Sequence, residues 1–428
     1  MRTEEPPRSA IDLDWVRPQF PALARALGGG PAVFFDAPGG TQVPRRVIDA
    51  MAGYLASSNA NTHGAFATSR ETDAVIASAR AAVADFLGCE AGEIVFGPNM
   101  TTLAFGLARA IGRELREGDE VVVTRLDHDA NVAPWAALAE RGAVVRTVDF
   151  HPEDCTLDMD DLARKIGPRT RLVAIGYASN AVGTVNDARE AVRLAHEAGA
   201  LAFVDAVHYA PHGPLDVRAI GCDFLACSPY KFFGPHLGVL YGRREHLGRL
   251  RPFKVRPAPD EVPERWETGT QSHEALAGVT AAVSYLEELG ARARPAATDR
   301  RSRLVAAMEA IREYERALSE RLIPGLLEIP GLTLYGVRDR GRFAARTPTV
   351  AVRLAGHSPR DLAARLAERS IFTWDGNFYA LGVTERLGVE ADGGLLRIGL
   401  VHYNTAGEVD RLLAELRRVA ETPGRTGA

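Results

Sequence analysis

The chain has 428 residues, of which 46% are hydrophobic and 25% charged, as is typical of a soluble globular protein of about two or three structural units. Its formal net charge of −4, with acidic and basic residues interspersed, argues against nucleic acid or an anionic membrane as a partner. The four cysteines have irregular spacing, which predicts neither a metal site nor a disulfide framework. The first residues lack a signal-peptide pattern and no apolar run is long enough to span a membrane, so we expect a cytoplasmic protein.

Short apolar runs alternate with helical stretches through the middle of the chain. The expected strands are Glu93–Gly97, Glu120–Thr124, Ala143–Phe150, Arg171–Gly176, Leu201–Asp205, Asp223–Ser228 and Leu237–Tyr241. The expected helices between them are Thr101–Arg116, Ala130–Arg141, Met159–Ile166 and Ala188–Ala198. Strands separated by helices of this length predict an α/β fold, with a mostly parallel seven-stranded sheet covered on both faces.

The last third of the chain has a different pattern. It is long and helical from 277 to 329, and then mixes the strands Thr349–Leu354 and Leu395–Val401 with the helices Pro359–Glu368 and Ala406–Val419. We therefore expect a large domain over 45–284 and a smaller α+β domain over 285–428. The N-terminal segment 1–44 precedes the first βα unit, and we expect it to pack with the small domain.

Lys231 and Asp205 suggest the chemistry. Each follows an apolar run, and ligands of parallel sheets bind at the carboxyl ends of strands. A lysine amine in such a place can form a Schiff base with pyridoxal phosphate, and an aspartate can keep the pyridine nitrogen of the cofactor protonated. A protonated ring is the better electron sink for charge at the substrate Cα. The pair predicts pyridoxal 5′-phosphate as cofactor and an amino acid as substrate.

The same region resembles the class V aminotransferase family of fold-type I pyridoxal-phosphate enzymes, in particular cysteine desulfurases and isopenicillin N epimerase-like proteins. The resemblance is carried, in the order of the family, by Asp127-His128-Asp129-Ala130-Asn131, Ser179-Asn180-Ala181-Val182-Gly183-Thr184, Ser228-Pro229-Tyr230-Lys231 and Tyr403-Asn404-Thr405. It implies a large cofactor domain, a small domain that contains both termini, and a homodimer with active sites at the interface.

The resemblance also implies roles for single residues. His128 would stack on the pyridine ring and relay a proton, and Asn180 would contact the substrate or the phenolic oxygen of the cofactor. His208 stands where desulfurases usually carry a glutamine that binds this oxygen. Arg397, on an apolar run, would hold the substrate carboxylate with its planar fork.

The cofactor phosphate needs hydrogen-bond donors. Asn99-Met100-Thr101-Thr102 follows a predicted strand and begins a predicted helix, so the backbone amides at Met100 and Thr101 and the Thr101 hydroxyl could bind an anion. Ser228 and Tyr230, beside the lysine, are further candidates. Thr270 resembles the residue that reaches the phosphate of the partner subunit.

One loop departs from the desulfurase pattern. Such an enzyme needs a mobile cysteine that takes up the substrate sulfur as a persulfide, whereas here the loop reads Phe372-Thr373-Trp374-Asp375-Gly376-Asn377-Phe378-Tyr379-Ala380. A phenol cannot replace a thiolate in that role, so Tyr379 is expected to act, if at all, as an acid. Trp374 would form an aromatic wall, and Gly39, Gly40 and His63 would line the mouth of the site.

We therefore expect a homodimeric lyase that eliminates the sulfur substituent from an S-substituted cysteine without a persulfide intermediate. Lys231 would be the acid and base at Cα. The alternatives are an amino-acid epimerase, a decarboxylating or deaminating enzyme, a cysteine desulfurase proper and a non-catalytic relative of the fold.

Overall fold

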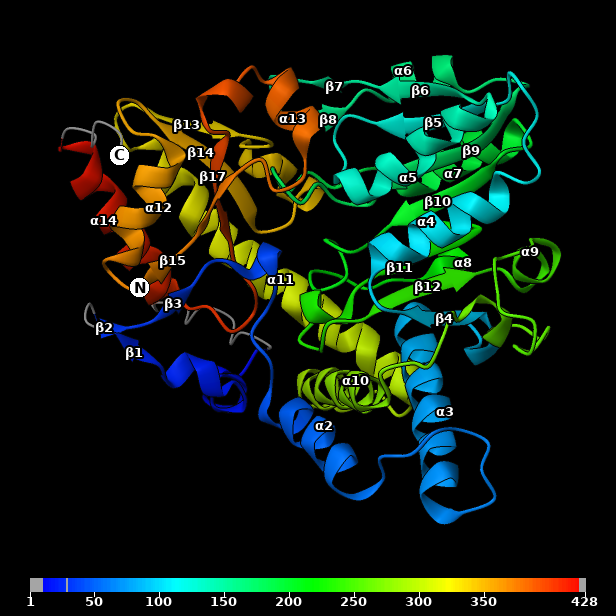
Figure 1. The fold of residues 1–428 in the computed structure, drawn as a ribbon. Helices are drawn as coiled ribbons and strands as arrows, with labels where there is room; N and C mark the ends of the chain where they lie inside the picture. The colour runs from blue at the N-terminus through cyan, green and yellow to red at the C-terminus, as the bar shows by residue number, and fades with distance from the viewer. Residues whose placement is uncertain (1–10, 28–29, 423–428) are drawn as a thin grey trace.

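The structure is a computed structural model that describes residues 11–27 and 30–422. Residues 1–10 and 28–29 of the predicted N-terminal segment, and the tail 423–428, lie outside the described residues. The described chain forms a large unit around one sheet and a smaller unit around a second sheet, with the long helix α11 (Arg300–Leu327) running between them (Figure 1). None of its helices is long and apolar enough to cross a bilayer.

The large sheet has seven strands in the order β4-β12-β11-β10-β9-β5-β6. Its strands are β4 (Ile94–Gly97), β5 (Glu120–Thr124), β6 (Val144–Val148), β9 (Thr170–Gly176), β10 (Leu201–Asp205), β11 (Phe224–Cys227) and β12 (Gly238–Gly242). Only β12 runs opposite to the others. This confirms the predicted α/β fold with a mostly parallel seven-stranded sheet.

Both faces of this sheet are apolar. Along β10, the neighbours Phe203 and Val204 point to opposite faces and are both fully buried, in two different hydrophobic clusters. The helices of the large unit include α2 (Arg45–Ser57), α3 (Ala67–Leu87), α4 (Met100–Ile111), α6 (Met159–Lys165), α7 (Ala188–Glu197), α8 (Val217–Ile220), α9 (Arg244–Arg249) and α10 (His273–Ala293). The helices α2, α3, α8 and α9 lie outside the predicted elements.

The predicted helix Ala130–Arg141 is wrong. The segment consists of a 3-10 turn η5 (Asp129–Asn131), a single α-turn α5 (Ala133–Ala136) and a second 3-10 turn η6 (Ala137–Arg141). Pro134 has no backbone N–H to donate to the preceding turn, and the backbone N–H of Ala130 donates instead to the side chain of His128. The predicted strand Ala143–Phe150 is likewise split, because β6 ends at Val148 and a short strand β7 (Phe150–His151) follows.

The smaller unit contains an antiparallel sheet in the order β13-β14-β17-β16. Its strands are β13 (Leu332–Tyr335), β14 (Thr349–Leu354), β16 (Trp374–Gly376) and β17 (Leu395–Gly399), and its helices include α12 (Pro359–Ala367), α13 (Leu381–Arg386) and α14 (Ala406–Ala420). Near the N-terminus, β3 (Val33–Phe34) pairs in parallel with β15 (Ile371–Phe372). The first part of the chain therefore lies beside the last part, as the blue and red segments of Figure 1 show.

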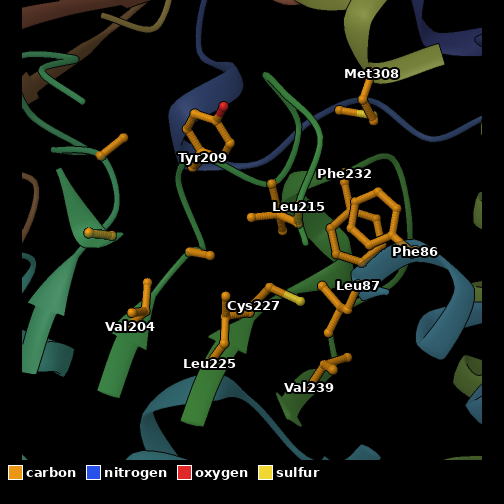
Figure 2. Packing of buried hydrophobic residues seen from close by; sticks show 14 of the residues in the cluster. Phe86, Leu87, Val204, Tyr209, Leu215, Leu225, Cys227, Phe232, Val239 and Met308 are labelled. Carbon is orange, nitrogen blue, oxygen red and sulfur yellow. The ribbon is translucent and has the colours of Figure 1, made fainter. Parts of the chain in front are cut away.

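The core beneath the end of β11 is closely packed. Figure 2 shows the side chain of Cys227 among apolar neighbours that include Leu87, Leu225 and Val239. Cys227 is fully buried, and burial raises the pKa of its thiol well above the usual range. This cysteine is a small core residue.

Candidate active site

Four neighbouring strands of the large sheet end at the same cavity. The order β11-β10-β9-β5 places four of the predicted site residues side by side, since each lies at or just after the carboxyl end of one strand: Lys231, Asp205, Asn180 and His128. The cavity has a volume of about 1020 Å³, and all four residues line it. Arg397, on β17 of the smaller sheet, also lines it. The cavity therefore lies between the two sheets.

Lys231 is held in a 3-10 turn η7 (Pro229–Lys231) directly after β11. Its amine donates a hydrogen bond to the carbonyl of Pro38 and lies 4.7 Å from the ring centroid of Tyr230. Burial, followed by the charge of Arg397, lowers the pKa of Lys231 to about 7, while Asp205 acts in the opposite direction. A large fraction of this amine is therefore neutral near pH 7 and able to attack a carbonyl group.

Asp205 faces the same cavity from the end of β10. Its carboxylate accepts a hydrogen bond from the backbone N–H of Val207 at 2.9 Å. Burial raises the pKa of Asp205 to about 6, and the hydrogen bond and the charge of Lys231 limit that rise. A cationic ring nitrogen beside this carboxylate would supply the opposite charge that it lacks.

Asp127 is a second buried carboxylate at the cavity, to which sequence reasoning assigned no role. It accepts hydrogen bonds from Gly176 N–H at 3.0 and 2.9 Å and from the side-chain amide of Asn131 at 2.8 Å. Burial and the nearby charge of Asp205 raise its pKa to about 7. A Cβ on Gly176 would lie 2.5 Å from Asp127 Oδ1, so the carboxylate fits here because the residue at the end of β9 is a glycine.

His128 is neutral at physiological pH. Its Nδ1 accepts a hydrogen bond from the N–H of Ala130 at 3.0 Å, which leaves the ring proton on Nε2. Burial, Lys231 and Arg397 together lower its pKa to about 4. The ring of Tyr379 stacks on this imidazole, with centroids 5.5 Å apart and an interplanar angle of 18°.

The loop around Tyr379 is tied to the large unit by its backbone. The side-chain amide of Asn180 donates to the carbonyl of Phe378 at 2.8 Å, and the N–H of Asp129 donates to the carbonyl of Tyr379 at 2.6 Å. Within the loop, the N–H of Tyr379 donates to Asn377 Oδ1 at 3.1 Å. Phe378 and Tyr379 both have φ of 58°, in the left-handed region that non-glycine residues rarely adopt. The loop thus has a defined conformation that sequence patterns do not reveal.

Arg397 has a buried side-chain donor that has no hydrogen-bond partner among the described residues. Its Nη1 donates to the carbonyl of Asn180 at 2.9 Å, and its guanidinium lies 4.2 Å from the ring centroid of Phe378. Its Nε is buried without a partner among the described residues, and so is Oδ1 of Asn180. Burial lowers the pKa of Arg397 to about 9, while the charge of Asp36 opposes this change. A carboxylate would satisfy the free donor and the uncompensated charge.

The start of α4 also lines the cavity, through Asn99, Met100 and Thr101. Asn99 caps the helix by accepting from the N–H of Thr102 at 2.8 Å, while the amides of Met100 and Thr101 occupy the first turn, where no partner exists within a helix. A Cβ on Gly238, at the start of β12, would lie 2.3 Å from the carbonyl carbon of Asn99. The bare glycine thus lets β12 approach the helix start. Such a helix start suits an anion such as phosphate.

Five further predicted site residues belong to the same cavity. His208, Ser228, Tyr230, Gly39 and Trp374 line the cavity. A Cβ on Gly39 would lie 2.3 Å from Trp374 Nε1, so the indole packs directly on that glycine.

Three predicted residues do not line the cavity of this chain. His63 is exposed and faces Asp73 at 3.5 Å, and Thr270 is exposed on a loop. Gly40 packs against the ring of Tyr230. Their roles stay predictions, and that of Thr270 concerns the phosphate of a partner subunit.

The groups around the cavity fit pyridoxal phosphate. The amine of Lys231 can bind its aldehyde and Asp205 its ring nitrogen, while His128 offers a flat face and the start of α4 offers amides to the phosphate. Arg397, which lines the same cavity, could bind the carboxylate of an amino acid.

Comparison with known proteins agrees with this fit. Residues 33–412 match the family described as "Aminotransferase class-V". The chain is 32% identical over 436 residues to a cysteine desulfurase of Klebsiella pneumoniae subsp. pneumoniae, covering 97% of this chain and 100% of the relative. It is 32% identical over 433 residues to a probable cysteine desulfurase of Mycolicibacterium paratuberculosis, covering 97% of this chain but only 59% of that longer relative.

A solved structure shares the architecture. The apo structure of a cysteine desulfurase from Thermococcus onnurineus NA1 is similar with a TM-score of 0.82 and 28% sequence identity, covering 91% of this chain and 95% of that one. The chain belongs to the class V aminotransferase family of fold-type I enzymes, which use pyridoxal 5′-phosphate.

Proposed function

We propose that this pyridoxal-phosphate enzyme cleaves the carbon–sulfur bond of an L-cysteine-type amino acid. Its relatives include proteins named cysteine desulfurase, which supports sulfur removal from cysteine itself better than elimination from an S-substituted cysteine. The observation that carries the proposal is the cavity lined by Lys231 and Asp205 from the large sheet and by Arg397 from the smaller sheet. When bound, the cofactor would supply an electron sink for charge at the substrate Cα.

Each residue would have a distinct task. Arg397 would bind the substrate carboxylate and thereby fix which Cα substituent points toward Lys231. Lys231, neutral near pH 7, would accept the Cα proton at its Nζ and return it. Asp205 would keep the ring nitrogen charged, and His128 would cover the ring face with a neutral imidazole.

The second candidate is β-elimination, which one observation favours. None of the four cysteines, all within the described part of the chain, lines the cavity. Burial raises the pKa of Cys89 and of Cys155 to about 12, and Cys222 and Cys227 are fully buried. These thiols are poor nucleophiles, so a sulfur atom expelled at the cavity would have no protein thiol to accept it. Elimination would release it as a thiol or sulfide.

The products separate the candidates. We would incubate the enzyme, reconstituted with pyridoxal phosphate, with L-cysteine and with S-methyl-L-cysteine, and measure alanine, pyruvate, sulfide, thiol and the enantiomer of the remaining substrate. Alanine from L-cysteine supports desulfuration, and pyruvate with a free thiol supports elimination. A Lys231→Ala variant is the matched control. Turnover of neither substrate, or accumulation of the D-enantiomer alone, would contradict carbon–sulfur cleavage.

We further propose that the active enzyme is a homodimer in the cytoplasm. The exposed loop that carries Thr270 is available to a second copy of the chain. Sedimentation of the reconstituted enzyme at assay concentration tests the dimer.

A further inference from the structure

Two neighbouring residues of the loop between β16 and α13 contact different side chains of the cavity. The guanidinium carbon of Arg397, on the smaller sheet, lies 4.2 Å from the ring centroid of Phe378. The ring of Tyr379 stacks on the imidazole of His128, which follows β5 of the large sheet. All four residues line the cavity. The conformation of Phe378 and Tyr379 therefore affects the site from both units.

That conformation is not the one that local preference favours. Phe378 and Tyr379 both have φ of 58°, which costs free energy in residues other than glycine. Tyr379 is also 73% exposed, so burial of its own side chain does little to offset that cost. Specific hydrogen bonds to the loop must therefore stabilise it.

Asn377 provides the bond that holds the N–H of Tyr379. Its Oδ1 accepts from this N–H at 3.1 Å, and its backbone carbonyl accepts from the N–H of Ala380 at 2.8 Å. The bonds from the large unit, donated by Asn180 and Asp129, end instead on the carbonyl oxygens of the pair. With its oxygen toward Tyr379, the side-chain amide of Asn377 must direct its nitrogen elsewhere.

Glu390 determines this orientation of the amide. It begins η10 (Glu390–Asp392), and its Oε1 accepts from Nδ2 of Asn377 at 3.0 Å. An ionised carboxylate has no proton to donate, so it can face only the nitrogen end of the amide. The other oxygen of Glu390 accepts from the hydroxyl of Thr384, a fully buried residue of α13. The carboxylate is thus held in place itself.

We propose that Asn377 and Glu390 are positioning residues for substrate binding, because together they keep Phe378 on Arg397 and Tyr379 on His128. A guanidinium that packs on an aromatic ring has fewer orientations available when a carboxylate arrives. If the loop is released, the substrate must order it, and the apparent affinity falls with the fraction of ordered loop. The role in substrate binding rests on the proposed function, whereas the dependence of the loop on these two residues does not.

Hydrogen–deuterium exchange of the full-length protein without substrate tests the loop. The amide of Tyr379 should exchange slowly in the wild type, although its side chain is exposed. Exchange should be roughly tenfold faster in Asn377→Ala and in Glu390→Ala. Glu385→Ala, at an exposed residue of α13, is the matched control and should exchange like the wild type. Equal exchange in the wild type and both loop variants would overturn the inference.

A conservative variant separates the hydrogen bonds from the negative charge. In Glu390→Gln, the new amide oxygen can still accept from Asn377, while its nitrogen can donate to the hydroxyl of Thr384. That hydroxyl can then donate to the carbonyl of Leu381, from which it lies 3.1 Å. Slow exchange should therefore return. Exchange as fast as in Glu390→Ala would contradict the orientation of the amide.

Kinetics of the holoenzyme test the effect on the substrate, with whichever of L-cysteine and S-methyl-L-cysteine it cleaves. Asn377→Ala should raise KM about 3- to 10-fold, with little change in kcat or in the absorbance of bound cofactor. In an Arg397→Lys background the same change should raise KM by less, because both substitutions act through one contact. Equal increases in both backgrounds would contradict action through Arg397. Failure of the wild type to cleave either substrate would instead contradict the proposed function and leave the exchange result standing.

Discussion

The phenol ring of Tyr379 lies on the imidazole of His128, with ring centroids 5.5 Å apart and planes 18° apart. The contact joins a loop of the smaller unit to the residue that follows β5 in the large sheet. Tyr379 is 73% exposed, yet it lines the cavity. The phenol is therefore accessible both from the cavity and from solvent.

Tyr379→Phe tests whether that hydroxyl acts as an acid. The variant keeps the ring and its stacking on His128 but has no proton to give. If Tyr379 protonates the departing sulfur, kcat should fall more for substrates with basic leaving groups than for those with acidic ones. Rates are to be compared over a series of S-substituted cysteines. An equal effect across the series would mean that the phenol only packs.

The pKa of Lys231 predicts how cofactor capture depends on pH. Only the neutral amine attacks an aldehyde, so the rate at which apoprotein binds pyridoxal phosphate covalently should rise with pH through about 7 and then level off. An ordinary lysine would continue to gain neutral amine up to its usual pKa of 10.5. Stopped-flow absorbance measures the rate.

A variant that removes one nearby charge tests the cause of this pH dependence. Arg397→Gln removes a positive charge that disfavours protonated Lys231, so the inflection should move to higher pH. A wild-type rate that keeps rising far above pH 7 would contradict the proposed environment of the amine.

Arg397→Lys keeps the positive charge but loses the planar fork. Substrate KM should rise about 10- to 100-fold, since a hydrogen bond to a charged group contributes about 1.5–3 kcal/mol. The absorbance of bound cofactor should stay unchanged. Arg46→Lys, at a surface arginine paired with Glu288, is the matched control and should leave KM as it is. A wild-type KM in Arg397→Lys would mean that another group holds the carboxylate.

Replacing all four cysteines tests where the sulfur goes. If sulfur leaves as a free thiol or sulfide, the variant with Ala or Ser at Cys89, Cys155, Cys222 and Cys227 should keep nearly all its turnover. Its stability should fall by roughly a few kcal/mol, because three of these thiols are buried. Single variants serve if the combined one is too unstable. Mass spectrometry that finds a persulfide on any of these thiols during turnover would restore the desulfurase mechanism.

The site residues on the large sheet were predictable because the apolar runs that predict the strands also indicate where each strand ends. Lys231 and Asp205 each follow an apolar run, and adjacent parallel strands bring such ends to one edge. The break of the predicted helix at Val132, between η5 and α5, was less accessible, since it depends on how His128 caps the preceding turn.

The other wall of the site depends on tertiary contacts. The local sequence does not predict that Asp127 is buried against Gly176. Nor does it predict that the side chain of Asn180 donates to the backbone carbonyl of Phe378. Two consecutive left-handed residues without glycine, Phe378 and Tyr379, contradict local preference. Such a conformation is imposed by contacts with residues distant in the sequence and cannot be derived from the sequence of the loop itself.

Gly176 and Gly238 are positions at which close packing limits which residues are tolerated. Neither contributes a functional group, but a single methyl group at either position would displace a carboxylate at the cavity or the backbone that begins α4. In a saturation mutagenesis scored by activity, we expect both to tolerate as little change as Lys231. The positions that tolerate no substitution would therefore include glycines that leave room at the cavity. The side chains with a chemical role would be only some of these positions.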